Sequence, residues 1–224
     1  GRYEEALGTF QDALRLAHAG QLAQVEAWVW TFTGRVHMLR QNLGEARECL
    51  SKGLATARAV RWTAFVPLPE ALLADVDLVE GRVDAAAGAH EHAHALALQL
   101  GDPCWEGLAA RGLGMVAAQQ GDAATALQWI TEARNRCVRL PDAYLWVEGY
   151  CLDALCALAV EQGRPEAARW IEDLEALATR TGMRELVARA YAHRGKLGDR
   201  AAADAAQVLA AEVDNPALRR PEGP

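Results

Sequence analysis

The chain has 224 residues and a formal net charge of −7, with 30 acidic against 23 basic residues. Its hydrophobic content of 51% is enough to bury a core, which excludes an intrinsically disordered chain. Proteins that bind nucleic acid neutralise phosphates with Lys and Arg. Because this chain has an acidic excess and no basic block, we expect no direct contact with nucleic acid.

The sequence carries no signal for secretion or for a membrane span. Its start includes Glu4 and Glu5 instead of an apolar stretch, and no run reaches the roughly 18 apolar residues that cross a bilayer. The five cysteines, an odd number without C-x-x-C spacing, are expected to be reduced, mostly buried thiols. We therefore expect a cytoplasmic protein that does not bind membranes.

A repeat of about 40 residues runs along the chain. Six similar segments start at Gly1, Gln41, Gly81, Gly121, Gly163 and Gly198. The first four starts are 40 residues apart, and the last two follow after 42 and 35 residues. Glycine ends a helix well because it adopts positive φ at no steric cost. Each unit is therefore predicted to be a helix, a tight turn and a second helix.

Small residues recur in register with these turns. An alanine follows each start by four or five residues, at Ala6, Ala46, Ala86, Ala126, Ala167 and Ala203. Four residues further on lies a larger side chain, such as Leu50 or Ile130, and small residues such as Gly34 and Gly114 stand seven residues before a turn. This spacing marks one buried helix face. The small residues are expected to let the two helices of a hairpin approach closely.

In chain order, the pattern predicts one array over residues 1–213. A half hairpin at 1–18 precedes hairpins at 21–60, 63–100, 103–139, 142–181 and 183–213, with breakers such as Pro141-Asp142 between them. Because Gly1 already lies in a turn, the first predicted helix lacks a partner, and we expect a piece of a larger protein. Residues 214–224 are predicted to be a flexible C-terminal tail.

This pattern resembles the tetratricopeptide repeat. The best match is the unit that contains Leu113-Gly114, the turn at Gly121, and then Ala126, Ile130 and Ala133. The resemblance implies an all-α fold, a right-handed superhelical solenoid of antiparallel helix hairpins, whose first helices line a concave surface. The unit of about 40 residues exceeds the ordinary repeat of about 34, which implies longer helices.

Arrays with this unit length are similar to the sensor region of large ATP-binding LuxR-type bacterial regulators, the maltose-activator-like STAND class. In that class the array follows an ATP-binding switch domain and usually precedes a helix-turn-helix domain. The sequence contains no phosphate-binding loop of the form G-x-x-x-x-G-K-[ST]. The resemblance therefore implies the regulatory array alone.

By position, the resemblance assigns ten residues to the concave groove: Trp28, Thr31, Arg35, Met38, Asp75, Leu108, Arg111, Met115, Tyr150 and Asp153. Two interpretations stay open. Arg35 and Asp75 occupy equivalent positions in neighbouring repeats, as do Arg111 and Asp153, so the lining is either solvated or joined by salt bridges. In the other interpretation, Arg binds a carboxylate or phosphate of a partner or effector, and an aromatic ring stacks on it.

Two histidines are weak candidates for a metal site. His90 and His94 are four residues apart, which places two imidazoles on one helix face. A metal needs further ligands, and the sequence has no H-E-x-x-H motif or matched acidic partner. His90 also falls at the buried position of the repeat. A buried structural histidine is therefore favoured, with a metal or pH-sensing role as the alternative.

Signatures of catalysis are missing from the sequence. It has no nucleophile elbow, and Gly112 and Gly114 lie within a predicted helix, so we expect neither enzyme activity nor a cofactor. The leading hypothesis is a regulatory module that binds a protein or peptide partner, or adjacent domains of its parent protein. The alternative is a domain that binds a small-molecule effector in the concave groove, and a purely structural arm is a third possibility.

Overall fold

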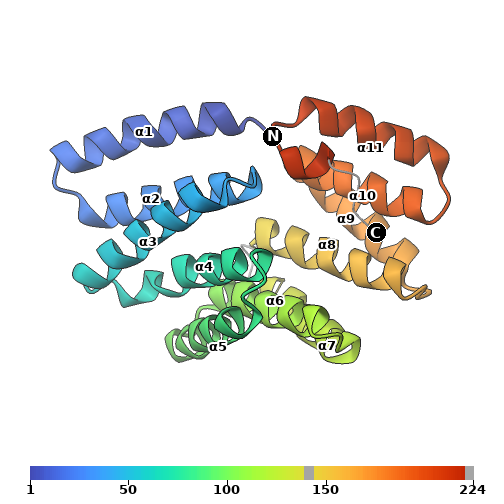
Figure 1. Cartoon of the computed structure of the whole chain (residues 1–224), viewed down its shortest axis with the longest axis horizontal. Helices are drawn as coiled ribbons and strands as arrows, with labels where there is room; N and C mark the ends of the chain where they lie inside the picture. The colour runs from blue at the N-terminus through green and yellow to red at the C-terminus, as the bar shows by residue number, and fades with distance from the viewer. Residues whose placement is uncertain (139–143, 220–224) are drawn as a thin grey trace.

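The computed structural model describes residues 1–138 and 144–219. Those residues contain α-helices and two short 3-10 helices, with no β-strand among them. In chain order the elements are α1 (Tyr3–Ala19), α2 (Ala23–Leu39), α3 (Leu43–Ala59), η1 (Thr63–Phe65), α4 (Pro67–Val79), α5 (Val83–Leu100), α6 (Pro103–Gln119), α7 (Ala123–Cys137), α8 (Leu145–Glu161), α9 (Ala167–Thr181), α10 (Arg184–Lys196), α11 (Arg200–Glu212) and η2 (Pro216–Arg219). The predicted all-α solenoid of helix hairpins is confirmed (Figure 1).

Five helices form the inner layer of the array. Each helix packs on its neighbours in the chain, and additional contacts join α2 to α4, α4 to α6, α6 to α8 and α8 to α10. These are the first helices of the predicted hairpins. Residues that face the inside of the solenoid therefore come from positions about 40 residues apart in the sequence.

The turns within hairpins reverse the chain at a residue with positive φ. Gly121 has a φ of 81°, and the N–H groups of Gly121 and Asp122 donate to the carbonyl oxygens of Ala118 and Ala117. This closes the end of α6 in a Schellman motif. The Asp122 side chain then accepts a hydrogen bond from the Thr125 N–H at 3.0 Å and caps α7.

Within a hairpin the helices touch at the small residues. A Cβ added at Gly34 of α2 would lie 2.6 Å from Leu50 Cγ and 3.0 Å from the carbonyl oxygen of Ala46. Gly114 of α6 stands in the same relation to Ile130 of α7. The large side chain on the second helix therefore fills the space left by the missing side chain on the first.

The superhelix curves until its two ends meet (Figure 1). The Tyr3 hydroxyl of α1 donates to Glu185 of α10, 182 positions away in the sequence. Arg40, at the end of α2, forms ion pairs with Glu4 at 2.7 Å and with Asp214 at 3.5 Å. The concave surface is thus closed across its open side by contacts between the first two helices and the C-terminal part of the array.

Part of the predicted C-terminal tail forms a short helix. Pro216–Arg219 form η2, and the Arg219 guanidinium donates to the carbonyl oxygens of Ala210 at 3.2 Å and Val213 at 3.0 Å. These hydrogen bonds tie η2 to the end of α11. The predicted breaker Pro141-Asp142 and the last residues of the tail, 220–224, lie outside the described residues.

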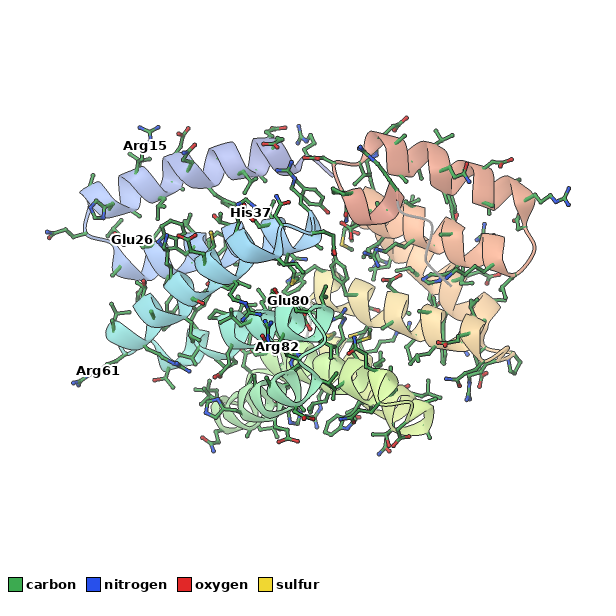
Figure 2. The ribbon with its side chains drawn as sticks, viewed as in Figure 1. Arg15, Glu26, His37, Arg61, Glu80 and Arg82 are labelled. Atoms are coloured by element: carbon green, nitrogen blue, oxygen red, sulfur yellow. The ribbon has the colours of Figure 1, made fainter. Side chains whose placement is uncertain are left out.

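The surface and the cysteines follow the sequence patterns. All five cysteines are free and buried, as expected. Charged side chains such as Arg15 and Arg61 point outward from the array (Figure 2). None of the described helices combines the length and the apolar character that a bilayer crossing requires.

The glycine contacts make a direct prediction about stability. Gly34→Ala should lower the free energy of unfolding by about 1–3 kcal/mol, because the new methyl group overlaps Leu50 and the backbone of α3. Gly88→Ala is the matched control: Gly88 lies in the exposed part of α5 with no atom within 4 Å of an added Cβ, so alanine should stabilise by up to about 1 kcal/mol. Urea unfolding measures both changes, and equal effects would contradict the packing argument.

Candidate functional site

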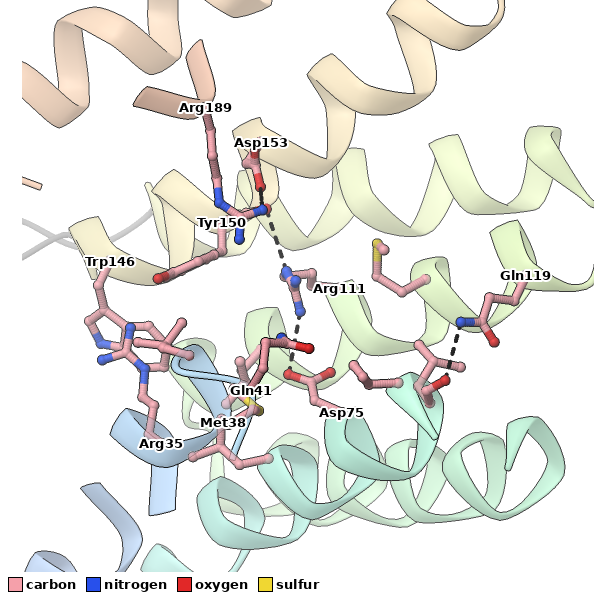
Figure 3. Close-up of a pocket in the computed structure, with 16 residues that line it drawn as sticks. Arg35, Met38, Gln41, Asp75, Arg111, Gln119, Trp146, Tyr150, Asp153 and Arg189 are labelled. Atoms are coloured by element: carbon pink, nitrogen blue, oxygen red, sulfur yellow. Dashed lines mark hydrogen bonds and ion pairs between the residues drawn. The ribbon is translucent and has the colours of Figure 1, made fainter. Parts of the chain in front are cut away.

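A pocket of about 210 Å³ opens on the inside of the array, between the five inner helices and the α2–α3 turn (Figure 3). Eight of the lining residues carry a charged, amide or phenol group: Arg35, Gln41, Asp75, Arg111, Gln119, Tyr150, Asp153 and Arg189. The other eight are mostly aliphatic: Met38, Leu39, Leu72, Leu78, Val79, Leu108, Met115 and Trp146.

The first ionic group in the pocket is centred on Asp75 of α4. Arg111 Nη1 lies 3.4 Å from Asp75 Oδ2, and His90 Nε2 lies 3.4 Å from Asp75 Oδ1. Burial alone would raise the pKa of Asp75, but the Arg111 guanidinium and His90 lower it below its ordinary value. Arg111 Nε also donates to the carbonyl oxygen of Tyr150 at 3.4 Å, which links α6 to α8.

The second ionic group is centred on Asp153 of α8. Arg189 of α10 donates to Asp153 Oδ2 at 3.0 Å, and His193 Nε2 lies 2.9 Å from Asp153 Oδ1. Burial by itself would raise the pKa of Asp153, but Arg189 and His193 lower it to about 2. Asp153 therefore stays ionised and holds α10 against α8.

Aromatic rings and Arg35 form one side of the pocket. The Arg35 guanidinium of α2 lies 4.1 Å from the ring centroid of Trp146 and 5.6 Å from that of Tyr150, both on α8 (Figure 3). These cation–π contacts cross the inside of the superhelix. Burial and the nearby Glu185 carboxylate raise the pKa of Tyr150, so its hydroxyl stays protonated and points toward Glu185, 3.4 Å away.

Of the ten residues assigned to the groove, eight line this pocket: Arg35, Met38, Asp75, Leu108, Arg111, Met115, Tyr150 and Asp153. Trp28 and Thr31 do not. Thr31 is fully buried, donates to the carbonyl oxygen of Ala27 and packs against Gly53 of α3. Trp28 is 44% exposed and packs on Phe32. Both precede Arg35 by one to two helical turns, so they lie nearer the start of α2 than the pocket does.

The sequence interpretation missed Trp146 and Arg189. Trp146 lies one turn before Tyr150 on the same face of α8, and this i, i+4 spacing was a usable signal. Arg189 lies on α10, the first helix of the last predicted hairpin, for which no groove residues were assigned. The repeat places Arg35 and Asp75 at equivalent positions, and likewise Arg111 and Asp153. In the structure the ion pairs are different: Asp75 pairs with Arg111, and Asp153 pairs with Arg189.

The two candidate metal ligands face different neighbours. His90 is fully buried and its ring packs against Gly112 of α6, whereas the His94 ring meets the edge of Trp129 with centroids 5.4 Å apart. Burial lowers the pKa of His94. In the described part of the chain, no three His, Cys, Asp or Glu side chains lie close enough to hold a metal ion.

Comparisons with known proteins identify the fold. No protein-family model and no curated protein matches the chain. The structure of the Rap conjugation gene regulator of the plasmid pLS20, in complex with the Phr* peptide, is 17% identical with a TM-score of 0.71. The match covers 84% of this chain and 52% of the regulator, so the chain spans about half the length of that protein.

A second similar structure is BtubC from P. vanneervenii. It is 17% identical with a TM-score of 0.61, and the match covers 100% of this chain and 95% of that one. At this level of identity the similarity establishes the fold: the chain is a tetratricopeptide-like helical repeat array.

The Asp153 cluster predicts a pH-dependent contribution to stability. The pKa of Asp153 is lower in the folded chain than in the unfolded one, so its contribution of about 2 kcal/mol is complete above about pH 4 and lost as the pH falls toward 2. Asp153→Asn should therefore lower the free energy of unfolding at pH 7, and the deficit should shrink at pH 3. Urea unfolding at both pH values measures this, with the exposed Asp204→Asn as the control; a deficit independent of pH would contradict the assignment.

Proposed function

We propose that the chain is a non-enzymatic interaction module that binds a short segment of a protein partner in its inner pocket. The observation that carries the proposal is a pocket with fixed polar and aromatic groups at the centre of a closed array. Asp75 and Asp153 are held by ion pairs to Arg111 and Arg189, so the lining is ordered before a ligand arrives. Such ordering lowers the entropic cost of binding.

The size of the pocket favours a chain end or a few side chains as the ligand. A volume of about 210 Å³ is far smaller than a folded domain. The Rap regulator that shares this fold was solved in complex with a peptide. That precedent supports the choice of a peptide.

We further propose that the module is the sensor part of a larger bacterial regulator of the ATP-binding LuxR type. The proposal rests on the length of the repeat and on the way the array closes. Because α1 and α2 contact α10 through Tyr3, Glu185 and Arg40, a ligand between these helices would change the curvature of the whole array. A change in curvature would move the ends of the array, and an adjacent domain can respond to that movement.

The thiols of the chain support a role without catalysis. All five cysteines are buried, and burial raises the pKa of the Cys104 and Cys156 thiols. A thiol that stays protonated at neutral pH is a poor nucleophile. The two pocket carboxylates are engaged in ion pairs.

A small metabolite in the same pocket is the second candidate. The observation in its favour is again the limited volume, which suits a compact molecule. A metabolite that binds the folded chain should raise its melting temperature through mass action. A screen of metabolites by thermal unfolding therefore separates this candidate from a peptide ligand.

Peptide binding can be tested with a substitution that fills the pocket. Peptides selected against the immobilised chain by display should lose at least about tenfold in affinity for Met115→Trp, because the indole occupies the space of the ligand. The control is Gln128→Trp, which adds the same side chain at an exposed position of α7. Isothermal titration measures both. Selected peptides that bind Met115→Trp and Gln128→Trp equally well would place their site elsewhere and overturn the proposal.

A further inference from the structure

Arg35 differs from the other arginines of the pocket in its partners. Arg111 pairs with Asp75, and Arg189 pairs with Asp153 and with Glu185. In the described ranges, no carboxylate lies within ion-pair distance of the Arg35 guanidinium and no hydrogen bond from it is found, so its contacts are the rings of Trp146 and Tyr150. Its N–H groups are therefore available to a ligand.

The Arg35 guanidinium is the pocket charge that has no ion-pair partner among the described residues. The other two guanidinium groups of the lining, Arg111 and Arg189, are paired with Asp75 and with Asp153 and Glu185. Arg35 also lies at the opposite end of the pocket from Gln119, away from the Asp75 carboxylate (Figure 3).

The N–H groups of a guanidinium lie in its own plane. When the guanidinium lies over an indole ring, these N–H groups point outward from its edge. A carboxylate can accept two parallel hydrogen bonds from such an edge, and this is among the strongest polar contacts that a protein makes. The Arg35 guanidinium lies over the ring of Trp146, 4.1 Å from its centroid, so it is held in the pocket before the ligand binds.

We propose that Arg35 binds a carboxylate group of the peptide ligand, with an apolar side chain of the same peptide beside it. This inference rests on the function proposed above and names the chemistry that the pocket selects. The aliphatic part of the lining, which includes Leu78 and Met115, supplies the surface for the apolar side chain. The carboxylate comes either from a chain terminus or from an Asp or Glu side chain.

The charge of the pocket selects a carboxylate over a phosphate. One negative charge neutralises Arg35, whereas a phosphate brings nearly two. The second charge would find no free cation in the described lining, because Arg111 and Arg189 are already held by Asp75 and Asp153. A phosphopeptide is therefore expected to bind more weakly than its carboxylate counterpart.

The test uses four sets of random hexapeptides titrated against the chain. One set is neutral with an amidated C-terminus, the second is neutral with a free C-terminal carboxyl group, the third is amidated with one Glu, and the fourth is amidated with one phosphoserine. The best binders of the second or third set should exceed those of the first and fourth by at least about tenfold. Whichever of these two sets binds better identifies the source of the carboxylate.

Two variants assign the preference to Arg35. Arg35→Gln should reduce the affinity of the carboxylate peptides to that of the neutral set, whereas Arg169→Gln removes the same charge from the exposed face of α9 and should change nothing. If Arg35→Gln fails to fold, Arg35→Lys keeps the charge and should retain only part of the preference, because an ammonium group cannot bind a carboxylate through a planar fork.

The outcomes separate the two proposals. Neutral or phosphorylated peptides that bind as tightly as carboxylate peptides would overturn the role of Arg35 and leave peptide binding intact. A carboxylate preference that survives in Arg35→Gln would do the same. If no set binds, peptide binding and the role of Arg35 are both overturned.

Discussion

The close approach of the two helices in each hairpin is the constraint on which the rest of the structure depends. Leu50 fills the space above Gly34, and Ile130 fills the space above Gly114, which fixes the separation of α2 from α3 and of α6 from α7. Small rotations between successive hairpins then add up along the array. Their sum brings Tyr3 to Glu185 and closes the concave side.

Closure turns an open groove into a pocket, and this changes the energetics of its charges. A carboxylate inside such a space is costly unless it is paired. Asp75 and Asp153 each have a guanidinium and a histidine within ion-pair distance, on helices other than their own. These groups therefore act first as structural links between repeats. Arg35, which lies over Trp146, is the exception, since no carboxylate among the described residues is within ion-pair distance of it.

Some charged groups of the pocket hold the helices together, and others are free to bind a ligand. The position of a residue in the repeat therefore does not predict which of the two it does. Arg35 and Arg111 both lie on inner helices and both line the pocket. Arg111 nevertheless holds Asp75 and the backbone of Tyr150, so replacing it would disturb the array itself. Replacing Arg35 breaks no ion pair among the described residues, which makes it the sharper probe of binding.

The sequence by itself determined the helices, the turns and the register of small and large residues, because backbone hydrogen bonds and packing within a hairpin involve neighbours less than about 40 positions apart. It also identified eight pocket residues, since a repeat places equivalent residues on one face. Only the tertiary structure decided that Trp28 and Thr31 lie outside the pocket, that Arg189 pairs with Asp153, and that Arg35 stacks on Trp146. These contacts depend on curvature summed over several repeats, which no local pattern encodes.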